Sequence, residues 1–312
     1  MSYRITNKMM ITNFMQSYHN SLTRMSRYQE MMQTNRRILR LSDDPVGILS
    51  SMTARNKLYN IEQYQRNVGD ANTWMTAAET SLMNMNEVLK DAIESGIDAG
   101  GLKGPSDKQA IAQKIKQIQE HVLTQLNETV GDKYVFSGYN TTTKPFTLDA
   151  GGKLLYNGMD VETAAGAQLT DELGQKIMFE VGAGQYMDVA IPGIRVTGVG
   201  PDNLYNVLGE LYDKLMADDG TASIMQTVEK LQDKQSHVLA MTAEIGGKCN
   251  RLDLLEYRYK ADYLNYTEMK SNVEDCDQAE AIMQFEMAKA VYQSALSVGA
   301  KIIQPTLTDF LR

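Results

Sequence analysis

Apolar residues recur every seven positions along the first forty residues. One heptad position holds Ile11, Tyr18, Met25, Met32 and Leu39, and a second holds Met15 and Leu22. Polar residues fill the positions between them. This spacing predicts a narrow coiled-coil seam over most of residues 6–40. No glycine or proline interrupts the segment, so we expect one helix that ends near Arg40.

The stretch LSDDPVG at 41–47 predicts a helix boundary. Asp44 is a good N-cap residue, and Pro45 suits the first helical position, where no backbone N–H is needed. The residue before a proline also avoids the α region. The pair Asp43–Asp44 could in principle bind a metal or act as acid and base. Capping explains the pair with fewer assumptions, so we expect a second helix from Pro45.

This second helix continues to about residue 95 with apolar residues at spacings of three, four or seven: Leu58, Ile61, Tyr64, Val68, Met75, Ala78, Leu82, Met85 and Leu89. A glycine-rich loop follows at 96–107, and it lacks the pattern of a phosphate-binding loop. A third helix is expected from about Asp107 to Val130. Its apolar residues are Ile111, Ile115, Ile118, Val122, Leu123 and Leu126.

The composition changes over residues 138–200, which hold 11 of the 23 glycines. Runs of β-forming residues, the last of them IRVTGVG at 194–200, alternate there with turn signals. DAGG at 149–152 and GAGQ at 182–185 are typical of hairpin turns. We therefore predict a small β-rich insertion.

The helical pattern returns after Pro201, first over 203–220 and then in a very long helix from about Thr221 to Ile303. Gly246–Gly247 is the candidate bend. Its coiled-coil positions are Leu252, Leu255, Tyr259, Tyr266, Met269, Val273, Cys276, Met283, Met287 and Ala290.

Together these elements predict a mainly α fold, an elongated antiparallel helical bundle or coiled coil formed by both chain ends, with a small β-rich inserted domain at the tip. Three parts follow from this pattern. Residues 1–43 and 270–312 form a terminal coiled-coil assembly domain. Residues 44–138 and 204–269 form a helical rod, and residues 139–203 form the β-rich domain.

Composition excludes several functional classes. The chain has 312 residues, a formal net charge of −8 and a pI near 5.1, which argues against nucleic-acid binding because phosphate contact needs a basic face. No segment approaches the roughly 18 consecutive apolar residues of a membrane span. The first residues are too polar for a cleaved signal peptide.

Catalytic and metal-binding patterns are missing as well. Cys249 and Cys276 are interpreted as buried or half-buried thiols without a redox role. The histidines, His19, His121 and His237, are scattered without ligand spacing. With no Ser/His/Asp constellation and no glycine loop in a βαβ context, we expect no catalytic residue, no cofactor and no metal, and therefore no enzyme.

Methionine is abundant, with 20 residues. An unbranched thioether adapts to several packings, so methionine suits a surface that is covered on assembly. We expect Met9, Met10, Met25 and Met32 to make subunit contacts. Ordinary core packing is expected instead for Met75, Met83 and Met85.

Three segments in the right order resemble the flagellin-like axial proteins of the bacterial flagellum, and among them the hook-associated proteins. The first is RITNKMM through LRLSDDPVGILSSM, with its S-D-D-P-V turn. The second is KYVFSGYNTTTKPF at 133–146, with an aromatic residue, then S-G, then P-F. The third is DCDQAEAIMQFEMAKAVYQSALSVGAKIIQPTLTDFLR at the end of the chain. The resemblance covers roughly residues 1–146 and 204–312. The sequence departs from the family pattern in one respect, because methionine is abundant at positions where leucine or isoleucine is usual.

This resemblance implies a structural protein that forms a ring at the junction between hook and filament. Its implied partners are copies of itself, hook-associated protein 1, flagellin and the filament cap, and an export chaperone that binds the C-terminal region; no nucleic acid and no membrane are implied. It also implies an extracellular location in the flagellum, reached by type III export without a cleaved signal. Two alternatives stay open. One is a flagellin-type filament subunit, since flagellin resembles the hook-associated proteins at both chain ends. The other is a coiled-coil signalling rod, and the β insertion argues against it.

The C-terminal stretch KIIQPTLTDFLR places five large apolar side chains in eleven residues: Ile302, Ile303, Leu307, Phe310 and Leu311. Soluble proteins seldom expose such a group without a use for it. The resemblance implies burial against neighbouring subunits. A tail that folds back on its own coiled coil is the alternative.

Overall fold

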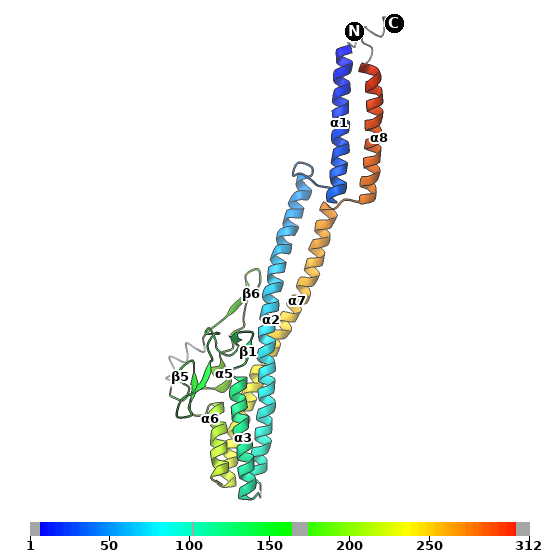
Figure 1. The fold of residues 1–312 in the computed structure, drawn as a ribbon. Coiled ribbons are helices and arrows are strands. Elements are labelled where there is room, and N and C mark those ends of the chain that lie inside the picture. Colours follow the sequence, from blue (N-terminus) through cyan, green and yellow to red (C-terminus); the bar gives the residue numbers. More distant parts are fainter. Residues whose placement is uncertain (1–6, 102, 164–173, 304–312) are drawn as a thin grey trace. The chain divides into compact units, whose positions relative to one another are not determined.

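The computed structural model describes residues 7–101, 103–163 and 174–303 (Figure 1). The predicted mainly α fold with a small β region is confirmed. The chain divides into two compact units. Residues 1–61 and 261–312 make up the first, here called the terminal unit, and residues 62–260 make up the second, called the central unit. Two long helices, α2 (Pro45–Ala99) and α7 (Thr221–Glu274), contribute to both units.

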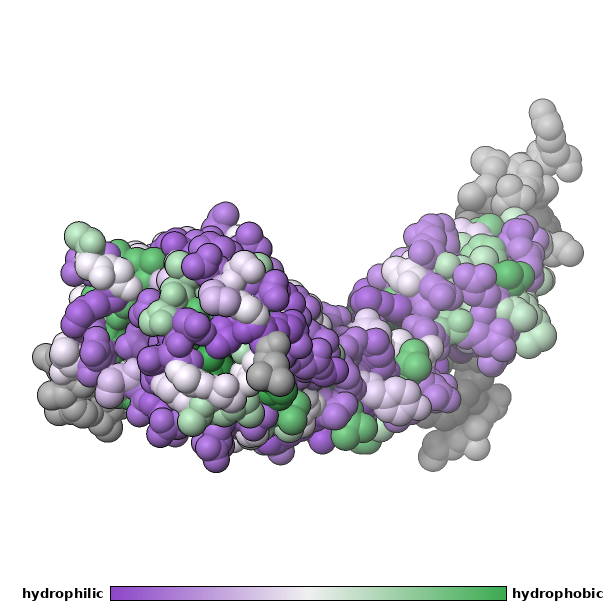
Figure 2. Space-filling model, turned by 90° about the horizontal axis from the view of Figure 1, so that it is seen from below, coloured by the Kyte–Doolittle hydropathy of each residue, from purple (hydrophilic) through white to green (hydrophobic). Residues whose placement is uncertain are grey.

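The central unit is a helical bundle in which α3 (Pro105–Gln125) and α6 (Leu204–Met216) lie beside α2 and α7 (Figure 1). A stripe of large apolar residues on each helix fills the core between them. Its fully buried members include Met75, Leu82, Met85, Leu89, Ile115, Leu126 and Leu204. These residues follow the predicted spacings of three, four and seven. The surface of this unit seen in Figure 2 is mainly hydrophilic, with hydrophobic residues in small separate groups.

The core prediction is confirmed for Met75 and Met85 but wrong for Met83, whose side chain is 55% exposed. The buried stripe of α2 passes through Leu82 and Met85. Met83 follows Leu82 by one residue, about 100° further around the helix, and therefore points away from the core.

The β region of the central unit consists of short antiparallel strands. A small hairpin joins β1 (Thr129–Val130) to β2 (Lys133–Tyr134). A three-stranded sheet holds β3 (Phe146–Leu148), β4 (Leu154–Tyr156) and β5 (Met159–Asp160). A second hairpin joins β6 (Met178–Gly182) to β7 (Gln185–Asp188). Both predicted turns contain a glycine with positive φ, Gly152 and Gly184, which explains the need for glycine there.

This β region lies beside the helices of the central unit, whereas the sequence pattern predicts it at their tip. The side-chain amide of Asn67 in α2 donates to the carbonyl of Glu180 at 2.8 Å. The hydroxyl of Tyr259 in α7 donates to the carbonyl of Val181 at 2.5 Å. These bonds hold strand β6 against the sides of α2 and α7. The helix α2 then runs on from Asn67 to Ala99.

The run IRVTGVG does not form a strand. Residues Gly193–Thr197 form the short helix α5, with Pro192 as the residue before it. A Cβ at Gly193 would collide with the ring of Phe146 and with the carbonyl of Phe136. Glycine therefore allows α5 to pack directly on the β region, and this close approach favours a helical turn over an extended strand.

The terminal unit contains α1 (Asn7–Thr34) and α8 (Gln278–Ile303), which pack side by side (Figure 1). The predicted helix over 6–40 ends early, at Thr34. Asn35 adopts a left-handed conformation with φ 54°, which ends the helix, and asparagine tolerates this region better than most residues. Residues 35–44 form a connector to α2, so Leu39 lies in the connector and not in a helix.

The predicted helix over 221–303 is also interrupted, at residues 275–277. It passes Gly246–Gly247 without a break. The carboxylate of Asp277 accepts a hydrogen bond from the N–H of Ala279 at 2.9 Å, as an N-cap does at the start of a new helix. The third helix likewise ends at Gln125 and not at Val130, which lies in β1.

Candidate assembly interface

The helices α1 and α8 form an antiparallel pair with a narrow internal seam. The hydroxyls of Tyr18 and Tyr292 are hydrogen-bonded at 2.9 Å, and their ring centroids lie 5.3 Å apart. This bond raises the pKa of Tyr292. The ring of Phe14 lies against Gly299, where a side chain would collide with it. Small residues on the inner face of α8, including Ala281 and Ala288, let the helices approach closely.

The predicted seam residues of the N-terminal segment lie as follows. Tyr18, Met25 and Met32 are half-buried on the face of α1 that meets α8. Ile11 is 37% exposed near the start of α1, and Leu39 is half-buried in the connector. At the second heptad position the structure buries Phe14, Ser21 and Tyr28 in part. Of the two residues predicted there, Leu22 is half-buried and Met15 is 43% exposed.

The inner face of α8 differs from the one predicted. Met283 and Met287 point outward, and Ala281, Phe285 and Ala288 point toward α1. The interruption at 275–277 explains the difference. Helical phase is not carried across three non-helical residues, so α8 begins with a new orientation of its faces.

Large apolar residues remain exposed on the outer faces of this helix pair. On α1 they are Met9, Met10, Ile11 and Met15, and on α8 they are Ile282, Met283, Met287, Val291, Leu296 and Val298. The helix α8 is therefore apolar both toward α1 and away from it. A helix that is hydrophobic all round is normally buried on all sides. Two helices cannot supply that burial, so the pair has the surface of a component of a larger assembly.

The interruptions of the two chain ends pair with each other through their backbones. The N–H of Arg37 donates to the carbonyl of Glu274 at 2.7 Å, and the N–H of Cys276 donates to the carbonyl of Asn35 at 3.2 Å. The side chain of Arg37 also donates to the carbonyl of Val273 at 3.0 Å. The end of α1 at Thr34 and the end of α7 at Glu274 therefore lie beside each other. The backbone N–H and C=O groups that have no helical partner at these two ends form hydrogen bonds with one another.

The Glu274 carboxylate is buried beneath this backbone pairing and held by side chains of α2. Arg55 donates to it from Nε at 2.7 Å and from Nη2 at 2.5 Å, and Ser51 donates a further hydrogen bond. The pKa of Arg55 is raised by this bond. A buried carboxylate is tolerated only when it is paired and hydrogen-bonded, and this one is.

The two aspartates of LSDDPVG have different structural roles. The Asp44 carboxylate accepts a hydrogen bond from the N–H of Gly47 at 2.9 Å, and Pro45 is the first residue of α2. Asp43 accepts from the N–H groups of Leu39 and Arg40, and the bond from Arg40 is the main reason that the pKa of Asp43 is lowered. Both carboxylates thus bind backbone N–H groups of the connector and of the first helical turn.

The tail residues fall largely beyond what the structure describes. Ile302 and Ile303 belong to the backbone of α8, and Leu307, Phe310 and Leu311 lie outside the described residues.

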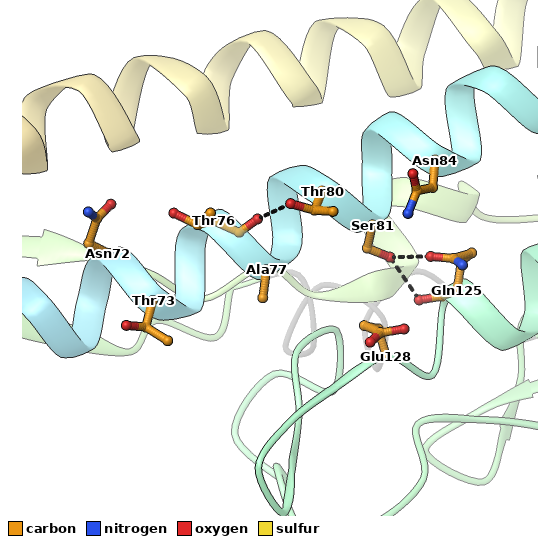
Figure 3. Close-up of a pocket in the computed structure, with 9 residues that line it drawn as sticks. All are labelled: Asn72, Thr73, Thr76, Ala77, Thr80, Ser81, Asn84, Gln125 and Glu128. Atoms are coloured by element: carbon orange, nitrogen blue, oxygen red, sulfur yellow. Dashed lines mark hydrogen bonds between the residues drawn. The ribbon is translucent and has the colours of Figure 1, made fainter.

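A groove in the central unit carries polar residues but no arrangement for catalysis. It has a volume of about 740 Å³ and is lined by Asn72, Thr73, Thr76, Ala77, Thr80, Ser81, Asn84, Gln125 and Glu128 (Figure 3). Ser81 donates to the carbonyl and to the side chain of Gln125, so its hydroxyl is not paired with a base. The lining has one carboxylate and no histidine or cysteine. We therefore find no nucleophile–base pair in it.

Two of the other candidate groups, Cys249 and His237, have structural surroundings. Cys249 is buried, and burial raises its pKa to about 11, so the thiol is protonated at neutral pH. His237 Nε2 lies 2.7 Å from the carbonyl of Arg195. Over the described parts of the chain, no group of three or more His, Cys, Asp or Glu is placed to hold a metal ion. Within the same residues, none of the helices combines the length and hydropathy that a membrane span requires.

Sequence reasoning missed several residues that organise this interface. The ion pair of Arg55 with Glu274 joins positions that are distant in the chain, and heptad spacing does not signal such a pair. The contact between Gly299 and Phe14 could not be predicted for a related reason. Heptad spacing identifies large apolar residues, and here an aromatic ring packs against a glycine. The one available signal was the recurrence of alanine at 281, 288 and 295, at heptad intervals.

Comparison with known proteins shows that this chain is similar to flagellar proteins. Residues 5–141 match the family of the bacterial flagellin N-terminal helical region. The flagellar hook-associated protein 3 of Escherichia coli (strain K12) is 25% identical over 311 residues, which covers 94% of this chain and 94% of that protein. The flagellar filament 33 kDa core protein of Treponema phagedenis is 20% identical over 278 residues, with 89% and 88% covered.

Solved structures show the same fold. The flagellar junction protein FlgL from Legionella pneumophila superposes with a TM-score of 0.58 and 14% identity, covering 74% of this chain and 100% of that one. FlgL from Bacillus cereus has a TM-score of 0.56 and 18% identity, covering 69% and 97%. The resemblance predicted from the three sequence segments is confirmed by these relatives.

Proposed function

We propose that this chain, which is similar to flagellar hook-associated protein 3, is a structural adaptor of the bacterial flagellum that joins the hook to the filament. Copies of the chain assemble into a ring at this junction, and the filament attaches to the ring. The role is mechanical and not enzymatic. Proteins of the axial structure must transmit torque, and packing between subunits is the property that this requires.

The observation that carries the proposal is the apolar outer face of the α1–α8 pair. Residues such as Met287, Val291 and Leu296 on α8 have no described partner side chain that covers them within the copy, and Met10 and Met15 on α1 are also exposed. Burial of apolar surface contributes roughly 25 cal/mol per Å². Covering this face in an assembly is therefore favourable. Ile11 and the predicted tail residues would take part in it, whereas Tyr18, Met25 and Met32 face α8 within the copy.

The partners in this proposal follow from the position of a junction ring. They are further copies of the chain, hook-associated protein 1 on the hook side, and flagellin together with the filament cap on the other side. An export chaperone would bind the C-terminal region before assembly. The protein would leave the cell through the flagellar type III apparatus, without a cleaved signal, and would reside in the extracellular flagellum.

The three-part division of the chain stays part of the proposal. Residues 1–43 and 270–312 would make the assembly contacts, residues 44–138 and 204–269 would form the rod, and residues 139–203 would be an accessory domain. The backbone pairing of Asn35 and Arg37 with Glu274 and Cys276 supports a boundary near those positions.

The proposal is tested by deleting the gene and examining the cells by electron microscopy. Hooks without filaments, together with unpolymerised flagellin in the culture medium, are the expected result, and a plasmid copy of the gene should restore filaments. Attached filaments in the deletion strain would overturn the proposal. The alternative of a filament subunit is favoured by the match to the Treponema filament protein. It predicts that this chain is a dominant band in sheared flagella, whereas a junction protein is a trace band.

A further inference from the structure

Charge is divided unevenly between the two chain segments of the terminal unit. Residues 1–61 contain nine Lys and Arg against three Asp and Glu, a net charge of +6. Residues 261–312 contain four Lys and Arg against eight Asp and Glu, a net charge of −4. The unit therefore has a basic N-terminal side and an acidic C-terminal side, although the whole chain is acidic.

These opposite charges are mostly not paired within the copy. Among the described residues, Arg55 with Glu274 is the ion pair that joins the two segments. The exposed residues Arg24 and Lys57 on the basic segment form no ion pair with a described residue, and the same holds for Glu268 and Glu280 on the acidic segment. The charges thus remain available to a partner.

The basic segment also carries an uncovered apolar stripe. In the first turns of α2, Val46 is 79% and Leu49 is 68% exposed, and Met52 and Tyr59 are exposed as well. Leu49, Met52 and Tyr59 are spaced by three and seven residues, which places them on the side of the helix opposite the buried Ala54, Leu58 and Ile61. Lys57 lies near one edge of this stripe.

The acidic segment has a matching combination. Leu264 is 68% exposed on α7, and Met269 on α7 and Met283 on α8 are also exposed. Glu268 adjoins Met269, and Glu280 is one turn from Met283. Both sides of the unit therefore combine exposed apolar residues with unpaired charge, and the charges are of opposite sign.

We propose that the basic side of the terminal unit docks on the acidic side of the terminal unit of a second copy. The inference rests on the proposed function, since it specifies how neighbouring subunits of the ring meet. Two basic sides or two acidic sides would repel each other, so the contact must be head-to-tail. A head-to-tail contact repeated by rotation closes into a ring. Charge complementarity fixes which sides meet, and the apolar residues contribute the area that is buried.

The test uses two charge-reversal variants of the full chain in the gene-deletion strain. The first is R24E together with K57E, which places two acidic residues on the basic side and lowers the net charge of residues 1–61 from +6 to +2. The second is E268K together with E280K, which places two basic residues on the acidic side and raises the net charge of residues 261–312 from −4 to 0. Each variant alone should fail to attach filaments, because the two reversed residues of every copy would face residues of like charge on its neighbour. The control K90E together with K144E reverses two exposed lysines of the central unit and should attach filaments as the natural protein does.

Expression of both variants in the same cell gives the decisive result. Copies of the two kinds can alternate, so that the introduced glutamates of one kind face the introduced lysines of the other, and filament attachment should return. Charges that matter only within one copy could not be rescued in this way. Melting curves of the purified variants should also match that of the natural chain, since the four residues have no ion pair to lose.

Filament attachment by either variant alone, or failure of the two together while both fold normally, would overturn the inference. These outcomes are distinguishable from failure of the proposed function, in which the deletion strain itself would keep its filaments. If a variant melts at a lower temperature than the natural chain, the neutral substitutions K57Q and E268Q replace it. Filament attachment by these variants is then measured over a series of sodium chloride concentrations. Head-to-tail pairing then predicts that attachment is weakened by either substitution and by added salt, and insensitivity to both would refute it.

Discussion

Arg55 donates hydrogen bonds to both carboxylate oxygens of Glu274, from Nε to Oε1 at 2.7 Å and from Nη2 to Oε2 at 2.5 Å. The pair joins the third turn of α2 to the last residue of α7. In addition, the N–H of Arg37 donates to the backbone carbonyl of the same glutamate. Glu274 thus connects three separate segments of the terminal unit, and it does so at the level where the helices of both chain ends are interrupted.

Glu274→Ala should lower the free energy of unfolding by about 1–3 kcal/mol, because it leaves a serine hydroxyl and a guanidinium without their acceptor. The Glu274 side chain is 7% exposed but that of Arg55 is 47% exposed, so water recovers part of the loss. Thermal melting followed by circular dichroism measures the effect. Glu286→Ala, which removes a surface pair with Lys289, is the control and should change stability by less than about 0.5 kcal/mol. Equal effects of the two substitutions would contradict a special role for Glu274.

The same substitution at two glycines should have opposite effects. At Gly299 an added methyl group collides with the ring of Phe14, whereas at Gly247 it meets nothing within 4 Å. Gly247→Ala should stabilise α7 by about 0.5–1 kcal/mol through helix propensity. Gly299→Ala should instead separate α8 from α1. Thermal melting measures the effect of Gly247→Ala, and hydrogen exchange of the α1 and α8 amides measures the effect of Gly299→Ala. Protection of these amides that does not fall in Gly299→Ala would contradict the close contact between the two helices.

Asp44→Ala should destabilise the protein by about 1 kcal/mol through loss of the hydrogen bond to the Gly47 N–H. Asp44→Asn should be nearly neutral, since asparagine caps a helix about as well. Melting curves with and without EDTA or added divalent ions provide the measurement. A metal site formed by Asp43 and Asp44 would instead make the natural protein sensitive to chelation, and the Asp44→Asn substitution would then destabilise it.

Acid should weaken a cluster of charges in the central unit. Hydrogen bonds from Lys214 and Lys230 lower the pKa values of Glu210 and Asp202, respectively. A carboxylate with a lowered folded-state pKa contributes stability above its unfolded pKa, and this contribution is lost as the pH falls through the folded value. Stability should therefore decline as the pH falls below about 5, where carboxyl groups of the unfolded chain begin to bind protons.

The variant Lys230→Met isolates this effect, since Lys230 contacts both Asp202 and Glu210. It should cost about 0.5–1 kcal/mol at neutral pH, because the pairs are partly exposed, and it should flatten the acid decline. Lys90→Met is the matched control, with no ion pair to a described residue. An unchanged pH profile in Lys230→Met would rule out the cluster as a source of acid sensitivity.

The fold could be predicted from the sequence where a local chemical signal marks it. Pro45 marks the start of α2, Gly152 and Gly184 mark hairpin turns, and the stripe through Met75 and Leu82 marks a buried helix face. The interruptions at Asn35 and at 275–277 could not be predicted in this way. Asn35 is compatible with a helix or with its end, and the backbone pairing that selects the end involves residues more than two hundred positions away.

The sequence predicts a helical seam between the two chain ends, but it does not predict every residue of that seam. The half-buried Tyr18, Met25 and Met32 follow the heptad pattern, since α1 is regular over that range. The face of α8 could not be derived, because its phase depends on the break before Gln278. The charge division between the chain ends is visible in the sequence alone. The structure adds that exposed charges such as Arg24, Lys57, Glu268 and Glu280 form no ion pair with a described residue of the same copy.

The last prediction concerns the apolar tail. Deleting residues 302–312 removes Ile302, Ile303, Leu307, Phe310 and Leu311. If neighbouring subunits bury these side chains, the truncated monomer should melt almost as the natural monomer does, yet filaments should not attach. Their burial at about 25 cal/mol per Å² would contribute several kcal/mol per subunit, less the cost of ordering the tail. Replacing the five residues by serine in the full-length chain is the control for chain length and should give the same result. A truncated monomer that melts much earlier but still supports attached filaments would show that the tail packs on its own helices, because stability would then be lost without any loss of assembly.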